Sequence, residues 1–276
     1  MINGMYLSTM GATCEMARHE TVSNNLANAN TDGFKPNFSI FRDVPAESVI
    51  KGDGRREIDV ILEKTGGGAW MDRTTTDFTP GPVVTTDNPL NMAINDKDRS
   101  RVSFFMVRPR DAADDDVRYT RNGTFMRAED GMLVTTDGDL VLDGGGGPIQ
   151  LTGSQGFYKV GDNGVVTVTN DFVDNAVLGQ VGLASITKEE AHFALRQLGN
   201  NQYVPDKTIN YELTFDTVNR TADTKSGLLE QSATNPVYEM VDMINAHRSF
   251  ELNMRFITMQ DQTLGQALSR LTARAG

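Results

Sequence analysis

The sequence predicts an α+β protein whose long N- and C-terminal helices pair with each other, with a central antiparallel all-β region between them in the chain. Two contrasts support this. Residues 1–30 contain no proline, and residues 237–272 contain no proline and a single glycine, Gly265. The middle holds the nine prolines and most of the 26 glycines, set between short apolar runs. Because glycine and proline punctuate secondary structure, the ends are expected to be helical and the middle to consist of short strands and turns.

The C-terminal end carries the strongest pattern. Residues recur there at alternating steps of three and four for more than four heptads, which is the spacing of a coiled-coil seam. Pro236 suits a first helical turn, with Asn235 as its N-cap. A helix of about 36 residues would be about 54 Å long, although an ordinary amphipathic core helix remains the alternative. The seam comprises Met240, Met243, His247, Phe250, Met254, Ile257, Asp261, Leu264, Leu268 and Leu271.

The N-terminal end shows a weaker version of the same spacing. Small and polar residues interrupt it, so this helix would be marginal alone and is expected to pair with the C-terminal one. It should end near 27–30, because Gly33 favours a left-handed backbone and Pro36 blocks further helix. Asn25 and Asn28 are expected to bond to backbone at this bend. The seam comprises Ile2, Met5, Thr9, Ala12, Met16, His19, Ser23 and Leu26.

The middle has the character of an antiparallel sandwich or barrel. Strands are expected at 102–107, at 165–169 and at 180–186. Two hairpins are also expected. One folds about the Asn122-Gly123 turn and the other about Asp137-Gly138-Asp139. The predicted division is a helix at 1–34, an extended linker at 35–88, the β domain at 89–205, an extended return segment at 206–235 and a helix at 236–276.

Composition and charge exclude several classes of partner and site. A net charge of −11 argues against binding nucleic acid or an anionic membrane surface. The single cysteine, Cys14, excludes an intrachain disulfide and a four-cysteine zinc site. We find no apolar run long enough for a cleaved signal peptide or a membrane span. The chain is therefore expected to stay in the cytosol, or to leave by a route that reads no such signal.

Residues that could carry chemistry do not form a recognisable site. His19 and His247 fall on the predicted seams, where packing is the simpler role, and His192 has no motif around it. Cys14 and His19 are five residues apart, so a helix would not bring them face to face. The acidic loop 111–116 lacks the spacing of a calcium loop. No catalytic, cofactor-binding or metal-binding residue is expected, and the chain is predicted not to be an enzyme.

Three stretches then resemble one family. Residues 21–35, TVSNNLANANTDGFK, resemble the N-terminal motif of bacterial flagellar rod and hook proteins. Residues 119–125 followed by 131–135 are similar to the central β domain of that family, and residues 235–271 to its C-terminal motif. The order of the three along the chain also agrees. The sequence differs from the family at 95–101, where a glycine-rich lead is usual, and the loop 111–116 is additional.

The resemblance implies a structural subunit of the flagellar basal body. In such proteins the terminal helices pair in a coiled-coil-like D0 domain that lines a hollow, torque-transmitting rod, and the β domain, D1, lies outside it. Export through the flagellar type III apparatus, without a cleaved signal peptide, and a place in the periplasm-spanning rod are implied too. The implied partners are copies of itself and other proximal and distal rod subunits, with neither nucleic acid nor direct membrane insertion.

The implied assembly interface draws on both ends of the chain. Length and the two ends resemble the proximal-rod type most, with the distal-rod or hook type as an alternative. A secreted adhesin or binding module with a helical stalk is the rival class. The interface is expected to contain Ile2, Met5, Met16, Asn25, Leu26, Asn28, Gly33, Phe34, Met240, Met243, Phe250, Met254, Ile257, Leu264, Leu268 and Leu271.

Overall fold

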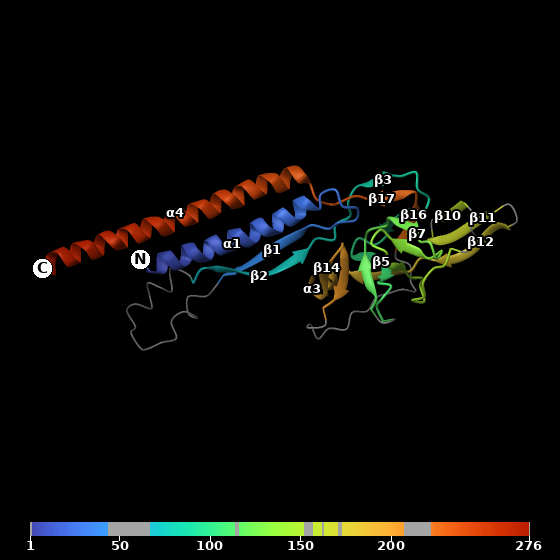
Figure 1. Ribbon diagram of the computed structural model, residues 1–276, viewed down its shortest axis with the longest axis horizontal. Helices are drawn as coiled ribbons and strands as arrows, with labels where there is room; N and C mark the ends of the chain where they lie inside the picture. Colours follow the sequence, from blue (N-terminus) through green and yellow to red (C-terminus); the bar gives the residue numbers. More distant parts are fainter. Residues whose placement is uncertain are drawn as a thin grey trace. The chain divides into compact units, whose positions relative to one another are not determined.

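The computed structural model describes residues 2–43, 67–113, 116–151, 157–161, 163–170, 173–206 and 222–275, which are arranged in two compact units (Figure 1). Unit 1 consists of Met1–Ala27, Asn37–Thr75 and Asn235–Gly276. Unit 2 consists of Asn28–Pro36 and Thr76–Thr234. Each unit is therefore assembled from segments that are distant in sequence.

Unit 1 contains two long helices and a two-stranded sheet. Helix α1 (Ile2–Ala27) lies beside helix α4 (Pro236–Ala275), and strands β1 (Asn37–Asp43) and β2 (Ala69–Thr76) pair next to α1 (Figure 1). The 40 residues of α4 span about 60 Å at ~1.5 Å per residue. Asn235 caps α4, because its Oδ1 accepts the Val237 N–H at 3.0 Å. The predicted ends of both helices are confirmed to within a few residues.

The centre of unit 2 is an eight-stranded sheet in the order β14-β15-β6-β5-β9-β8-β7, with β13 also paired to β5. All its pairings are antiparallel. The strands are β5 (Arg101–Arg108), β6 (Arg118–Thr120), β7 (Phe125–Arg127), β8 (Leu133–Thr135), β9 (Leu140–Val141), β13 (Leu183–Thr187), β14 (Leu195–Gly199) and β15 (Gln202–Pro205).

Smaller sheets complete unit 2. A three-stranded antiparallel sheet contains β10 (Phe157–Val160), β11 (Val165–Asn170) and β12 (Val173–Gln180). Two further pairs join segments far apart in sequence. In these, β16 (Ala222–Ser226) pairs with β4 (Met92–Asp96), and β17 (Leu228–Glu230) pairs with β3 (Val83–Thr85). The chain that returns toward α4 is therefore incorporated into the β unit.

Unit 2 buries its own apolar side chains in two clusters. The first surrounds Phe105 and Phe125, whose rings meet edge to face with centroids 5.1 Å apart. The second surrounds Phe104, Tyr203 and Phe78, whose ring centroids lie 5.4–5.6 Å apart. Most members of both clusters are less than 5% exposed, so this unit has a core that is shielded from solvent.

Several predictions for the middle of the chain are confirmed. The strand at 102–107 is β5, and the strand at 165–169 is β11. The predicted turn at Asp137-Gly138-Asp139 connects β8 and β9, which pair through Val134 and Leu140. Gly138 takes a φ of +91°, a backbone conformation that glycine adopts without the steric cost of a Cβ.

The predicted hairpin about Asn122-Gly123 is wrong. Strand β6 pairs with β5 and β15, whereas β7 pairs with β8, so the two strands do not pair with each other. Gly123 lies instead against the start of β4, where its carbonyl accepts the Met92 N–H at 3.0 Å. A Cβ at Gly123 would overlap the Met92 carbonyl oxygen. Glycine is therefore required here for close backbone approach rather than for a hairpin turn.

Three other expectations need correction. The middle is not all-β, because helix α3 (Lys188–Ala194) follows β13 and is capped by the Thr187 hydroxyl. The segment expected to be an extended linker, 35–88, includes β1, β2 and β3, and 206–235 includes β16 and β17. Short polar strands with one apolar side are easily mistaken for coil. Residues 44–66 and 207–221 lie outside the described residues.

Candidate functional site: the terminal helices and the anchor of their connectors

Contacts between α1 and α4 follow a heptad ladder made of small and polar side chains. A Cβ built on Gly4 would lie 2.5 Å from Gln260 Nε2, and one built on Gly11 would lie 3.1 Å from the Asn253 amide. Asn25 Nδ2 donates to Glu239 Oε1 at 3.3 Å. Positions 4, 11 and 25 thus face positions 260, 253 and 239, so each step along α1 is matched by an equal step backward along α4. The two helices are therefore antiparallel.

Only about half of the seam residues predicted on α4 lie on the side that faces α1. Met243, Phe250, Ile257 and Leu264 are partly buried, as expected. Met240, Met254 and Leu268 are 42–63% exposed, and His247 and Asp261 are exposed as well. Their places are taken one residue earlier, at Glu239, Ala246, Asn253 and Gln260, among which Ala246 is buried. A hydrophobic pattern could not predict these four contact positions, because they are small or polar. They face α1 because short side chains and glycines allow the two helices to approach closely.

The N-terminal seam is likewise only half on the contact side. Met5, His19 and Leu26 are partly buried and Ala12 is buried, but Met16 is 51% exposed. The buried positions also include Val22 and Asn25. The side chains of Ile2 and Leu271 lie outside the described residues.

Large hydrophobic side chains cover much of the outer surface of α4. A helix that is apolar on all sides is normally buried, and an extended exposed apolar surface marks an interaction site. These side chains do not contribute to the pairing with α1 described above. They are at least 42% exposed and comprise Val237, Tyr238, Met240, Val241, Ile244, Leu252, Met254, Phe256, Met259 and Leu268.

Asn25 joins the end of α1 to strand β1. Its side chain is 1% exposed. Its amide Nδ2 donates to the Asn37 carbonyl at 2.9 Å, and its Oδ1 accepts the Asn37 N–H at 2.9 Å. This two-bond bridge confirms the expected backbone contact of Asn25. Asn28 also bonds to backbone at the bend, where its carbonyl accepts the Thr31 N–H.

The two connectors that lead to the helices pair with each other inside unit 2. Gly33 N–H donates to the Glu230 carbonyl at 2.6 Å, and Ala233 N–H donates to the Phe34 carbonyl at 3.1 Å. Gly33 has a φ of +67°, and a Cβ there would lie 2.5 Å from the Arg121 carbonyl carbon. Phe34 is 1% exposed. The predicted left-handed turn at Gly33 is confirmed, and a second constraint, the Arg121 backbone, accompanies it.

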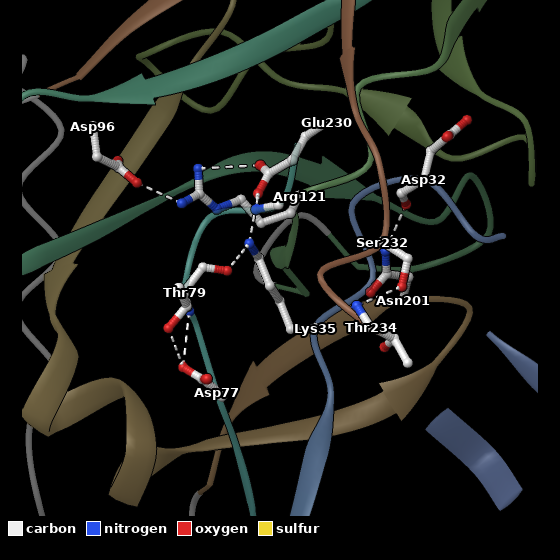
Figure 2. Close-up of polar contacts among 11 residues, drawn as sticks. Asp32, Lys35, Asp77, Thr79, Asp96, Arg121, Asn201, Glu230, Ser232 and Thr234 are labelled. Atoms are coloured by element: carbon white, nitrogen blue, oxygen red, sulfur yellow. Dashed lines mark hydrogen bonds and ion pairs between the residues drawn. The ribbon is translucent and has the colours of Figure 1, made fainter. Parts of the chain in front are cut away.

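Four buried charges hold these connectors (Figure 2). Lys35 Nζ contacts Glu230 Oε1 at 2.5 Å and donates to the Thr79 carbonyl at 2.7 Å. Arg121 forms an ion pair with Asp96, and its Nη1 lies 3.7 Å from Glu230 Oε2. The side chains are 0–9% exposed, and two positive and two negative charges balance. We call Lys35, Glu230, Arg121 and Asp96 the charge quartet.

The charge quartet shifts the titration of two of its members. Burial and the neighbouring Arg121 charge lower the pKa of Lys35 to about 8. Burial alone would raise the pKa of Glu230, but the charges of Arg121 and Lys35 and the Gly81 N–H hold that pKa below its usual value. Both side chains are therefore charged at neutral pH. Removing the partner of either one would destabilise the fold, because it would leave an unpaired buried charge.

Sequence reasoning missed the charge quartet. Lys35 stands between Phe34 and Pro36, and this apolar setting was the one local signal that its side chain is buried. Arg121, Asp96 and Glu230 come from segments whose proximity depends on strand pairing, in particular on β16 beside β4 and β17 beside β3. No local pattern could have brought them together.

The residues considered for chemistry have structural partners. The ring centroids of His19 and His247 lie 6.4 Å apart, one on each helix, and His192 Nδ1 lies 2.7 Å from the Thr76 carbonyl. Cys14 donates to the Ala69 carbonyl at 3.2 Å, and burial, with the Glu15 charge, raises the pKa of its thiol. A raised pKa disfavours the reactive thiolate.

The described residues contain no group of three or more His, Cys, Asp or Glu side chains placed to hold a metal ion. None of the helices in these ranges is both long enough and apolar enough to cross a bilayer. Of the acidic loop, Asp116 pairs with Arg118 at 3.1 Å, and Asp114 and Asp115 lie outside the described part of the chain.

Comparison with known proteins matches the helices and the β unit separately. Residues 5–35 match the family described as flagella basal body rod protein. Residues 102–168 match the D1 domain of the flagellar hook protein FlgE/F/G, and residues 225–270 match the C-terminal part of the flagellar basal body rod FlgEFG protein. In all three segments the chain is therefore similar to flagellar basal-body rod and hook proteins. The matched segments at the two ends contain all the ladder residues on α1 and α4 except Gly4, and most of both connectors.

Full-length relatives agree with this assignment. The chain is 29% identical over 276 residues to the flagellar basal-body rod protein FlgG of Buchnera aphidicola subsp. Schizaphis graminum, covering 98% of this chain and 100% of that protein. It is also 29% identical over 271 residues to FlgF of Caulobacter vibrioides, covering 98% of each. FlgG of Bacillus subtilis is 26% identical, covering 98% of this chain and 99% of that protein. Relatives of both types match equally well.

Proposed function

We propose that this chain is a structural axial subunit of the flagellar basal-body rod. In this proposal α1 and α4 form the coiled-coil-like D0 domain, and copies polymerise through these helices into a hollow shaft that transmits torque. Unit 2 then corresponds to the D1 domain. The chain acts without catalysis.

The observation that carries the proposal is the outer surface of α4. Ten large hydrophobic side chains on this one helix are at least 42% exposed, whereas unit 2 buries most of its own in two clusters and exposes only scattered ones such as Phe193 and Val177. Burial of a large side chain is worth about 1.5–3 kcal/mol, so covering even part of this surface with neighbouring subunits would strongly favour assembly. Of the interface residues predicted from the sequence, Met240, Met254 and Leu268 lie on this exposed surface. Asn25 and Phe34 are 1% exposed, so their contacts are made within the chain.

The charge quartet supports the transmission of torque. A load on either terminal helix travels along the chain into its connector, and the two connectors are bonded to each other at Gly33 and Phe34. The ion pair of Lys35 with Glu230 joins the same two connectors a second time through side chains. A buried, charge-balanced cluster resists separation because each unpaired charge would be left in a poorly solvated place.

We further propose the place and the partners of the subunit. Export by the flagellar type III apparatus, without a cleaved signal peptide, would deliver the chain to a rod that crosses the periplasm. Its neighbours would be copies of itself and other rod subunits. The proximal-rod type, FlgF, remains our preferred assignment over the distal-rod type, FlgG, on the resemblance of its ends.

Complementation of a strain that lacks this gene tests the proposal. The full chain should restore rods and motility, whereas chains without residues 2–27 or without residues 236–275 should restore neither, because each lacks half of the helix pair. Electron microscopy of isolated basal bodies would score the rods. Rod formation by either shortened chain would contradict the proposal, and a β unit that bound a ligand without any role in rods would favour the adhesin class.

A further inference from the structure

A groove in unit 1 lies where the end of α1, the start of α4 and strand β1 meet. Its volume is about 300 Å³, which is at the lower end for binding pockets and suits side chains of a docked segment. Its lining combines apolar and acidic groups. It consists of Arg18, Thr21, Val22, Asn25, Asn37, Phe38, Ser39, Phe41, Glu239 and Asp242.

The apolar part of the groove is open to solvent. Phe38 is 49% exposed and Phe41 is 38% exposed, although both are aromatic and lie on a short strand. Val22 beneath them is 6% exposed. Aromatic side chains exposed beside a groove are typical anchors for a partner, because they bury a large area without much loss of conformational freedom.

The charges in the lining leave an excess of negative charge. Glu239 and Asp242 contribute two carboxylates, and Arg18 lies 3.5 Å from Asp242 as the one cation among the lining residues. Burial, followed by the nearby Asp242 charge, raises the pKa of Glu239 even though Asn25 donates to it. A second cation placed here would relieve the repulsion between the two carboxylates.

The far end of α4 has complementary properties. Because Gly4 faces Gln260, the residues after about 262 extend past the start of α1, as Figure 1 shows. In this overhang, residues 264–275, the described side chains include Leu264, Leu268 and Arg270, and its sequence contains no acidic residue. Leu268 is 63% exposed. The overhang therefore combines an apolar stripe with positive charge.

We propose that the overhang of α4 from one copy docks into this groove on a second copy, with Leu268 against Phe38 and Phe41 and Arg270 facing Glu239 and Asp242. The groove and the overhang lie at opposite ends of the helix pair, so the contact is heterologous and each copy keeps one free groove and one free overhang. Repetition of such a contact gives an open helical array rather than a closed ring. The inference rests on the proposed function and specifies which surfaces meet.

Cross-linking in assembled rods tests this contact. Two full-length variants, both with Cys14→Ser, would be produced together in a strain lacking the gene, one with Ser39→Cys in the groove and one with Leu268→Cys on the overhang. A short bis-maleimide applied to isolated basal bodies should join them as a heterodimer. Replacing Ser39→Cys by Thr13→Cys is the matched control, since Thr13 is exposed on α1 but does not line the groove, and it should give none.

A charge reversal adds a quantitative arm. Arg270→Glu should lower the yield of heterodimer by roughly tenfold or more, because it places a third carboxylate against the groove. Arg270→Lys should retain the yield, and Arg255→Glu, an exposed position before the overhang, should leave it unchanged. If Ser39→Cys prevents incorporation, Thr21→Cys replaces it, because it lines the same groove.

The outcomes separate this inference from the proposed function. Rods that contain both variants but give no heterodimer, or in which Leu268→Cys joins a different protein, would overturn the docking of the overhang onto a second copy. Absence of the Cys14→Ser chain itself from basal bodies that otherwise assemble would instead count against the proposed function.

Discussion

The two units differ in where they place their large apolar side chains. Unit 2 encloses most of its aromatic and aliphatic residues in two clusters, and its four buried charges are paired and balanced. Unit 1 joins its helices through glycine, alanine and amide side chains, and leaves Phe256, Met259 and Leu252 more than half exposed. Most of the apolar side chains in the described part of unit 2 are therefore covered within one chain, whereas those of α4 are left to solvent, which is what the proposed assembly through unit 1 requires.

In the proposed rod subunit, this difference assigns recognition and the transmission of load to separate parts of the molecule. An interface that must form repeatedly needs exposed apolar area, which a single folded chain normally avoids. A connection that must resist force needs buried ion pairs, because separating such a pair leaves an unpaired charge in a poorly solvated place. The helices supply the first property and the charge quartet supplies the second.

The largest expected effect comes from a charge on the α1 side of α4. Ile257→Asp should block incorporation into the rod and abolish motility, because an unpaired carboxylate would replace a partly buried apolar side chain. The β unit should stay folded, as judged by its near-ultraviolet circular dichroism. Thr136→Asp, in an exposed turn of unit 2, is the control and should be incorporated normally. Normal motility of Ile257→Asp would refute the assignment of this side of α4.

Breaking the charge quartet should strongly destabilise unit 2. Lys35→Met should cost about 3–5 kcal/mol of unfolding free energy, because it leaves the buried Glu230 short of one cation. The double variant Lys35→Met/Glu230→Gln restores charge balance and should be more stable than Lys35→Met. Denaturant titration measures both. If the double variant loses the sum of the two single effects, the quartet is not a balanced cluster.

The pKa of Lys35 predicts a dependence of stability on alkaline pH. Its folded value of about 8 lies below the ordinary value of 10.5, so the unfolded chain binds more protons between these limits. Relative to Lys35→Met, the wild-type unfolding free energy should therefore rise between pH 8 and 10.5, by up to about 3 kcal/mol. Parallel denaturant titrations at several pH values give this difference. A constant difference across the window would contradict it.

A larger side chain at Gly11 should disrupt the close packing of α1 against α4. A Cβ there already lies 3.1 Å from the Asn253 side chain, so Gly11→Leu should separate α1 from α4 at a cost of about 1–3 kcal/mol. At Gly265 the same substitution meets nothing within 4 Å and should stabilise α4 slightly. Thermal melting followed at 222 nm compares the two. Equal effects would show that the ladder does not set the helix spacing.

The sequence was informative where structure is local. Proline-free ends, the Asn235 cap and the Gly33 turn predicted both helices and their ends, and Asp137-Gly138-Asp139 predicted one hairpin. The prediction failed where non-local contact decides. The predicted Asn122-Gly123 hairpin does not form, because Gly123 packs against the backbone of Met92. At alternate positions of α4 the residue that contacts α1 is one earlier than predicted, and glycines on α1 allow the close approach there.

The most direct test of the central claim is the accessibility of the outer face of α4 before and after assembly. In a Cys14→Ser background, Phe256→Cys places a thiol at a position that is 54% exposed in the single chain. A maleimide reagent should label this thiol readily in the purified chain and scarcely at all in isolated rods, because neighbouring subunits cover the helix. Equal labelling in the two states would show that this face stays free, and would contradict assembly through the terminal helices.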